Sequence, residues 1–333
     1  MNDIINVNNA VKASVIIPIK DFKNRYFDDC LKSIEIQDYS YPYEIIVVSG
    51  GNRAQARNHG IQIAKGDIIA FIDSDCIAPK HWLSTIIDNL EANVHIKGVG
   101  GYGISDNKLS LIGKAIDYVY STYLGSLNSP SIYSGINKVS SKIVDGLSAH
   151  NSAYWKNTLI ELGGFDVRFD LNEDSNLHHK IESHKYQLLL IPKIYVYHRR
   201  KESIKEFFKK FFNYGMGRMR SILTNKQYFD LNKLLPFIGA LIFLFFIYFY
   251  PLISEIFFLV YLTMVFYYGF RAVYVTRDIL FAILVPIMFI IQHLSYFLGM
   301  MSGLFKGKWK KKKENVKFHV HSKIIDHTSQ NIR

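Results

Sequence analysis

Two pairs of acidic residues have a spacing that suits catalysis by carboxylates. The first, Asp73-Ser74-Asp75, follows the apolar run IIAFI directly. Burial of carboxylates is costly, so both acids are expected at the open end of a strand. Two such groups one residue apart can hold a divalent cation through oxygen atoms, and the cation would neutralise a diphosphate. The alternative is a turn or helix cap, where Asp and Ser are common.

The second pair, Glu173-Asp174, begins the run EDSNLHHKI. A positioned carboxylate could take the proton from an attacking hydroxyl group, which is otherwise a poor nucleophile. The alternative is that both acids only complement the positive end of a helix dipole.

Alternating strands and helices are predicted to position these groups. Continuous apolar runs predict strands at residues 13–19, 43–49 and 67–73. Helical patterns lie between and after them, at residues 25–37, 53–65 and 80–91. Strands that alternate with helices indicate βαβ units and a parallel sheet. Ligands of such sheets bind beyond the carboxyl ends of the strands, which here are residues 18–21, 49–53 and 73–76.

The ordered series SVIIPIKD, EIIVVSGG, ARNHGIQIAKGDIIAFIDSD and GGFD, followed by Glu173-Asp174, resembles family 2 glycosyltransferases over residues 13–220. The resemblance implies an α/β GT-A fold, with a mainly parallel sheet flanked by helices. It also implies transfer of a sugar from a nucleotide-diphosphate donor with inversion. Inversion requires no second carboxylate nucleophile, because the acceptor attacks opposite the departing diphosphate.

The resemblance also implies roles for individual residues. Asp174 would be the general base, with Glu173 as the second choice. A divalent cation, Mn²⁺ or Mg²⁺, would be held by Asp73, Asp75 and His198. The nucleotide-sugar site would comprise Pro18, Lys20, Asp21, Ser49, Gly50, Arg53, Arg57, Asp73, Ser74, Asp75, Arg199 and Arg200. The alternative for His198 is an ordinary histidine at a strand end. The alternative for Arg199 and Arg200 is that they face lipid headgroups.

Three local features refine this interpretation. The segment Ser49-Gly50-Gly51-Asn52 lacks the acidic residue that the family commonly places after its second strand, so the base of the donor is not implied. The Q-x-x-R-W motif of processive synthases is absent, which favours addition of a single sugar. The glycine-rich segment 98–103 matches G-x-G-x-x-G but does not open the first βαβ unit, and is predicted to be a flexible turn.

Composition excludes several classes of protein. Of 333 residues, 49% are hydrophobic and 20% charged, which excludes a disordered chain and a collagen-like fibre. The 2 cysteines cannot form a disulfide framework. The net charge of +12 favours an anionic partner. Nucleic acid is not expected, because the basic residues cluster beside apolar segments and no nucleic-acid motif is present.

Three apolar stretches predict a membrane domain. Each approaches or exceeds the roughly 20 residues that a spanning helix needs. They cover residues 234–253, 256–275 and 279–305, and the last is interrupted by Pro286, Gln292, His293, Gly299 and Gly303. Two to three spans are therefore expected, because three full spans would place the following lysines outside, against the positive-inside rule.

Four consecutive regions result from these patterns. They are a catalytic domain at 1–200, an amphipathic helix region for the membrane interface at 201–230, the transmembrane helices at 231–305 and a basic polar tail at 306–333. The interface helix would present Ile204, Phe207, Phe208, Phe211 and Phe212 to lipid. The alternative is a helix that packs on the catalytic sheet. The N-terminus does not resemble a signal peptide, which predicts an integral protein of the cell membrane with its catalytic domain on the cytoplasmic side.

The sequence thus predicts a membrane-anchored glycosyltransferase. Its partners would be a nucleotide-diphosphate sugar, a lipid-linked or membrane-proximal glycan acceptor, and membrane lipids. The alternative is a non-catalytic membrane protein whose GT-A-like module binds a nucleotide sugar or scaffolds a complex. The presence of Asp73, Asp75 and Asp174 together favours the enzyme.

Overall fold

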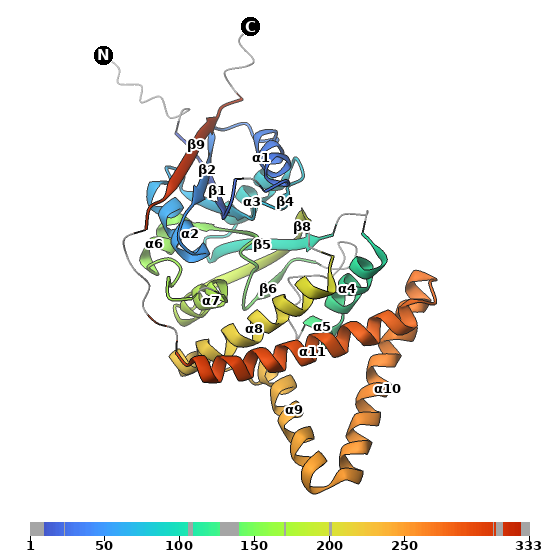
Figure 1. Ribbon diagram of the computed structural model, residues 1–333. Helices are drawn as coiled ribbons and strands as arrows, with labels where there is room; N and C mark the ends of the chain where they lie inside the picture. The colour runs from blue at the N-terminus through green and yellow to red at the C-terminus, as the bar shows by residue number, and fades with distance from the viewer. Residues whose placement is uncertain are drawn as a thin grey trace, which may run out of the picture. The chain divides into compact units, whose positions relative to one another are not determined.

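The computed structural model describes residues 10–22, 24–105, 109–126, 140–169, 171–199, 202–308, 310 and 316–327. The chain forms two compact units (Figure 1). The sheet unit comprises Met1–Ser105, Ser134–Arg199 and Lys311–Arg333. The helical unit comprises Asp106–Tyr133 and Arg200–Lys310. The consecutive regions predicted from sequence differ from this division, because a segment before residue 134 joins the helices and the tail joins the sheet.

In the described part of the chain, the sheet unit contains one 9-stranded sheet with the order β4-β8-β5-β7-β3-β1-β2-β9, and β6 pairs with β8 beside this path. The strands are β1 (Ala13–Ile19), β2 (Tyr43–Ser49), β3 (Ile68–Ile72), β4 (Cys76–Ile77), β5 (Ile96–Ile104), β6 (Lys142–Val144), β7 (Asn151–Trp155), β8 (Gln187–His198) and β9 (His319–Ile325). The helices of this unit are α1 (Phe27–Glu35), α2 (Arg53–Ile63), α3 (Trp82–Glu91), α6 (Lys156–Glu161) and α7 (Glu173–Ser183).

Apolar burial on both faces explains the central strands. Every residue of β1, β2 and β3 is buried. On one face, side chains such as Val15 and Ile17 pack in a core with α1 and α3. On the other, Ile16 and Phe71 pack in a core with α2, α6 and α7. The predicted strands and the three predicted helices are therefore confirmed, with ends shifted by a few residues at most.

The sheet is mixed rather than mainly parallel. β1 pairs in parallel with β2 and β3, and β5 pairs in parallel with β8. The pairs β3–β7, β5–β7, β4–β8, β6–β8 and β2–β9 are antiparallel. The alternation of strands and helices, which predicts parallel pairing, ends after β5, and antiparallel β7 lies between the two parallel groups.

The glycine-rich segment predicted to be a flexible turn lies inside β5. A Cβ atom on Gly101 would collide with the carbonyl oxygen of Ile194 in the neighbouring strand β8. Gly98 and Gly100 also lie in contact with adjacent side chains or backbone. The glycines therefore permit close packing in a buried strand, a role that local sequence does not distinguish from a turn.

The C-terminal tail adds a strand to the sheet at residues 319–325, and most of the side chains of this strand remain exposed. These residues form β9, which pairs with β2 over its whole length, from Ser49 opposite His319 to Tyr43 opposite Ile325. Phe318 stacks on His59 of α2 with ring centroids 4.3 Å apart. The strand covers an edge of the sheet that would otherwise expose unpaired backbone groups.

The helical unit consists of α4 (Leu111–Ser121), α5 (Tyr123–Ser126), α8 (Ile204–Thr224), η2 (Lys226–Tyr228), α9 (Leu231–Phe249), α10 (Pro251–Thr276) and α11 (Phe281–Lys306). Phe207 and Phe211 of α8 are buried in the core of this unit, beside Tyr120 of α4. These two rings are therefore not presented to lipid as the sequence predicted. Phe208 and Phe212 remain partly exposed and stack on each other.

Three of the described helices, α9, α10 and α11, are long and apolar enough to cross a membrane. α9 and α10 are joined at Tyr250 as a hairpin. In Figure 1 this hairpin leaves the layer of α8 and α11 and returns to it.

We predict that Gly50→Ala loosens the tail and that Gly163→Ala does not. Both glycines have positive φ, 117° and 68°. An alanine at Gly163 meets nothing within 4 Å and should cost about 1 kcal/mol of unfolding free energy from backbone conformation alone. An alanine at Gly50 would also collide with the carbonyl oxygen of Lys317, just before β9. Limited proteolysis should cut the tail faster only in Gly50→Ala, and equal cutting in both variants would contradict this.

Candidate active site

The first acidic pair lies where β3 ends. Every residue of β3 is buried, and Asp73-Ser74-Asp75 follow it at the edge of the sheet. The Sγ atom of Cys30 donates to the Asp73 carbonyl oxygen at 3.5 Å. Asn24 Nδ2 donates to Ser74 Oγ at 3.1 Å. These contacts with residues in and before α1 hold the acidic loop at the carboxyl end of the strand.

Asp75 lies beside His198. β4 pairs with the end of β8, which sets Cys76 opposite His198. The Arg199 N–H donates to the Asp75 carbonyl oxygen at 2.9 Å and extends this pairing. His198 Nε2 then lies 3.4 Å from Asp75 Oδ1, and both side chains retain some exposure.

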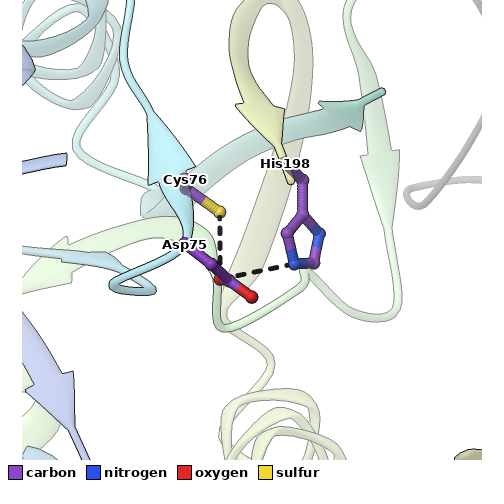
Figure 2. A group of neighbouring side chains, drawn as sticks. All are labelled: Asp75, Cys76 and His198. Atoms are coloured by element: carbon purple, nitrogen blue, oxygen red, sulfur yellow. Dashed lines mark hydrogen bonds and ion pairs between the residues drawn. The ribbon is translucent and has the colours of Figure 1, made fainter. Parts of the chain in front are cut away.

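Cys76 completes a cluster of three potential ligand groups (Figure 2). Figure 2 shows the Asp75 carboxylate between the Cys76 thiol and the His198 ring. The ligand atoms of Asp75, Cys76 and His198 all lie within 4.8 Å of one another. Burial opposes ionisation of Asp75, but its hydrogen bond with His198 and the charges of His198 and Arg53 outweigh burial, so its pKa is lowered. Asp75 therefore favours its ionised form, which is the form that binds a cation.

The carboxylate and imidazole of this cluster fit a divalent metal ion. Carboxylate oxygen suits Mg²⁺ and Mn²⁺, and imidazole suits a transition metal. His198 Nδ1 is buried and has no hydrogen-bond partner within the described ranges. The His150 ring lies 4.8 Å from the His198 ring. The sequence did not single out Cys76 or His150 as ligands, because neither belongs to a motif. Cys76 follows Asp75 directly, whereas His150 is distant from it in sequence and only the fold brings it near.

Asp73 does not join this cluster, although it was predicted to bind the metal. Its Oδ1 accepts a hydrogen bond from Arg57 Nη2 at 3.1 Å. Arg57 Nη1 donates to Glu173 Oε1 at 2.6 Å. The guanidinium, with the side chain only 1% exposed, thus lies between two carboxylates. Arg57, which the sequence predicts near the diphosphate, links the loop after β3 to the start of α7.

The second acidic pair lies in the first turn of α7, after Asn172. Glu173 is buried and bound to Arg57, whereas Asp174 is partly exposed. Burial raises the pKa of Glu173, although the Arg57 guanidinium acts in the opposite direction. Asp174 is therefore the carboxylate of this pair that a ligand can reach.

The turn after β2 leads into α2 through two glycines with positive φ, Gly50 and Gly51. Asn52 caps α2: its side chain accepts from the Gln55 N–H at 2.9 Å. Arg53 follows in the first turn and is exposed, and its charge acts on both Asp75 and Glu173. The capped start of α2 therefore aims a cation at the two acidic pairs.

The remaining predicted residues differ in their surroundings. Lys20 and Asp21 are exposed after β1, and Ser49 ends β2. Pro18 is buried within β1. Arg199 pairs with Asp29 and lies over the Tyr26 ring. Arg200 lies outside the described residues.

Comparison with known proteins gives matches of three kinds. Residues 50–163 match the sequence model of the family described as Glycosyl transferase family 2. A Haloferax volcanii protein named glucosyl-dolichyl phosphate glucuronosyltransferase is 26% identical, over 29% of this chain and 39% of that protein. The chain therefore matches less than half the length of this relative.

Two similar solved structures are of TarS from S. aureus, each with 16% identity. One covers 65% of this chain and 40% of its own, with a TM-score of 0.40. The other, TarS 1-349 in complex with UDP-GlcNAc, covers 63% of this chain and 67% of its own, with a TM-score of 0.43.

We predict that Arg57→Met strongly destabilises the sheet unit. It would leave two carboxylates without a partner, one of them buried, and breaking a buried pair in this way costs about 3–5 kcal/mol. Because burial raises the pKa of Glu173, the acid should take up a proton once the guanidinium is removed. A raised pKa in the folded state favours folding at low pH, so the deficit should shrink as the pH falls toward about 4.3, the ordinary value for glutamate.

The control is Arg168→Met, which removes a pair with Asp166 in which Arg168 is 43% exposed. That pair should contribute about 1 kcal/mol or less. Thermal unfolding of both variants over a range of pH measures the difference. Equal losses in the two variants would contradict a structural role for Arg57.

Proposed function

Because residues 50–163 match the sequence model of glycosyl transferase family 2, we propose that the chain is an inverting, single-addition glycosyltransferase. It takes a nucleotide-diphosphate sugar as donor and a lipid-linked or membrane-proximal glycan as acceptor. The observation that carries the proposal is the buried contact of Arg57 with Asp73 and Glu173. Asp73 lies two residues before Asp75, and Glu173 lies directly before Asp174. Both Asp75 and Asp174 remain accessible.

Asp174 acts as the general base. The acceptor hydroxyl forms a C–O bond to the anomeric carbon of the sugar while the bond from that carbon to the nucleotide diphosphate breaks. The hydroxyl proton passes to the Asp174 carboxylate, which is partly exposed and adjacent to the clamped Glu173. Arg57 is a positioning residue in this scheme, because its guanidinium is bound by Asp73 and Glu173.

Asp75 and His198 would hold a divalent cation, Mn²⁺ or Mg²⁺, whereas Asp73 is bound to Arg57. When bound, such a cation stabilises the negative charge that develops on the leaving diphosphate. Arg53, at the start of α2, adds positive charge on the same side, and Lys20 and Asp21 lie at the end of the neighbouring strand β1. These residues, with Ser49 and Gly50, form the donor site.

The helical unit supports an acceptor at the membrane. Three of its helices are long and apolar enough to cross a bilayer. The relative from H. volcanii is named for an acceptor linked to dolichyl phosphate, a lipid. We assign the chain to the cell membrane with the sheet unit on the cytoplasmic side.

The full-length protein, purified in detergent, tests this proposal. It would be incubated with radiolabelled nucleotide sugars and total lipid extract, with and without manganese. Label should enter the lipid fraction for one donor. If no donor labelled lipid or glycan, the non-catalytic alternative, a module that binds nucleotide sugars or scaffolds a complex, would be supported instead.

We predict that Asp174→Asn separates binding from chemistry. The amide keeps the size of the carboxylate but cannot take the proton, so turnover should fall by about 10²–10⁴ while donor affinity persists. Glu173→Gln is the comparison: it weakens the contact with Arg57 and should lower the unfolding temperature, which Asp174→Asn should not. Near-normal turnover in Asp174→Asn would assign the base elsewhere.

A further prediction concerns the cation. Asp75→Asn should abolish the gain in donor affinity that Mn²⁺ gives in calorimetry, and His198→Ala should reduce it. Asp88→Asn, an exposed acid on α3, serves as the control and should leave the gain unchanged. An undiminished manganese effect in Asp75→Asn would remove Asp75 from the metal site.

A further inference from the structure

The pairing of β9 with β2 limits how the chain can cross a membrane. The sheet unit contains residues on both sides of the segment 200–310 in sequence. β9 is bound to the sheet by seven register pairs, and Lys323 Nζ lies 2.8 Å from Glu35 Oε1. Both ends of the intervening segment must therefore lie on one side of the bilayer. A chain that leaves and returns to one side crosses an even number of times, so the three apolar helices cannot each be a full span.

α11 is the helix that differs from the other two. In its most apolar stretch, 44% of residues are buried within the protein, compared with 11% for α9 and 17% for α10. It packs on α8 through glycines. A Cβ atom on Gly299 would collide with the carbonyl oxygen of Phe212. A Cβ atom on Gly303 would lie 2.8 Å from the carbonyl oxygen of Met216. The spacing G-x-x-x-G allows two helix backbones to approach closely.

α8 is too polar to accompany α11 across the hydrocarbon. It carries Lys205, Glu206, Lys209, Lys210, Arg218 and Arg220. At its far end, Arg220 Nε donates to the carbonyl oxygen of Gly307, which follows α11, at 3.1 Å. α11 thus runs beside a charged helix, as Figure 1 also shows. A charge in the centre of a bilayer is costly, so this helix pair belongs at the interface with water.

The face of α11 that turns away from α8 is a stripe of exposed apolar side chains. It is formed by Leu280, Ile283, Ile287, Ile290, Leu294 and Leu298. These residues recur at intervals of three and four, which places them on one side of a helix. α10 contacts α11 through the Tyr268 and Phe289 rings, and α9 and α10 also expose many apolar side chains. Lipid is therefore the partner that fits the stripe.

We propose that α9 and α10 alone cross the bilayer, and that α11 lies in the plane of the membrane on the side of the sheet unit, with this stripe against the acyl chains. α9 has 19 residues. At 1.5 Å each these span about 28 Å, close to the hydrocarbon thickness. This arrangement also satisfies the positive-inside rule. Lys233, Arg277 and Lys306 then lie on the side of the sheet unit, and the hairpin tip at residues 249–254 contains no Lys or Arg.

Labelling of single added cysteines with a membrane-impermeant maleimide tests the crossings in the full-length protein in sealed vesicles. Native Cys30 and Cys76 are fully buried, so protein without an added cysteine gives the background. Val94→Cys marks the side of the sheet unit, Tyr248→Cys marks the hairpin tip, and His321→Cys marks β9. We expect Tyr248→Cys on the side opposite Val94→Cys, and His321→Cys on the same side.

Depth measurements test whether α11 lies in the plane. A fluorophore on the added cysteine would be quenched by lipids that carry a nitroxide at known depths. Ile283→Cys, Ile290→Cys and Leu298→Cys should report one shallow depth. On α10, Leu252→Cys and Tyr274→Cys should be shallow and Phe266→Cys deep, as in a spanning helix.

Three results would overturn the proposal. Labelling of β9 on the side opposite Val94→Cys would show that α11 crosses the bilayer. Ile324→Cys, at a second exposed position in β9, repeats this measurement in case His321→Cys disrupts the strand. The hairpin tip on the same side as Val94→Cys would show that no helix crosses. A depth maximum at Ile290→Cys would show that α11 enters the bilayer core. These measurements do not depend on glycosyltransferase activity.

Discussion

The arrangement of the acidic groups in the sheet unit depends on one buried positive charge, the Arg57 guanidinium. Arg57 is 1% exposed, and a buried guanidinium is stable only when opposite charges and hydrogen bonds replace water. Asp73 and Glu173 supply both, from the end of β3 and the start of α7. Three elements, α2, β3 and α7, must therefore be in register before the charge is compensated. The same requirement fixes the relative position of the two acidic motifs.

Because of this constraint, the two carboxylates of each acidic pair have different roles. In each motif one carboxylate, Asp73 or Glu173, is used to hold Arg57, and the other, Asp75 or Asp174, stays accessible. Asp75 then meets His198 because β4 pairs with the end of β8. The accessible carboxylates have different surroundings, since Asp75 faces an imidazole and a thiol and Asp174 lies at the start of a helix. Such a difference suits one acid to a cation and the other to a proton.

The C-terminal strand gives the sheet a second constraint, which acts on the membrane segments. Pairing of β9 with β2 satisfies the backbone groups of a buried strand that would otherwise form an open edge. It also returns the chain to the sheet unit after the apolar helices, which fixes the parity of the crossings. A local feature of the sheet thereby determines how three helices of similar hydropathy can be used differently.

The sequence by itself determined the elements whose signals are local. Unbroken apolar runs predicted β1 and β2. The glycine-rich segment 49–53 and the acidic segment 73–76 marked the edge of the sheet. Three long apolar stretches marked α9, α10 and α11. Tertiary structure decided which groups meet. The partners of Arg57 are 16 and 116 residues away in sequence. β9 comes from a polar tail whose strand signal is weak, and Gly101 lies in a buried strand although its neighbours in sequence resemble a turn. Hydrophobic periodicity and helix capping depend on residues that are close in sequence. The partner of a buried charge or of a sheet edge is decided only when segments distant in sequence pack together and exclude water.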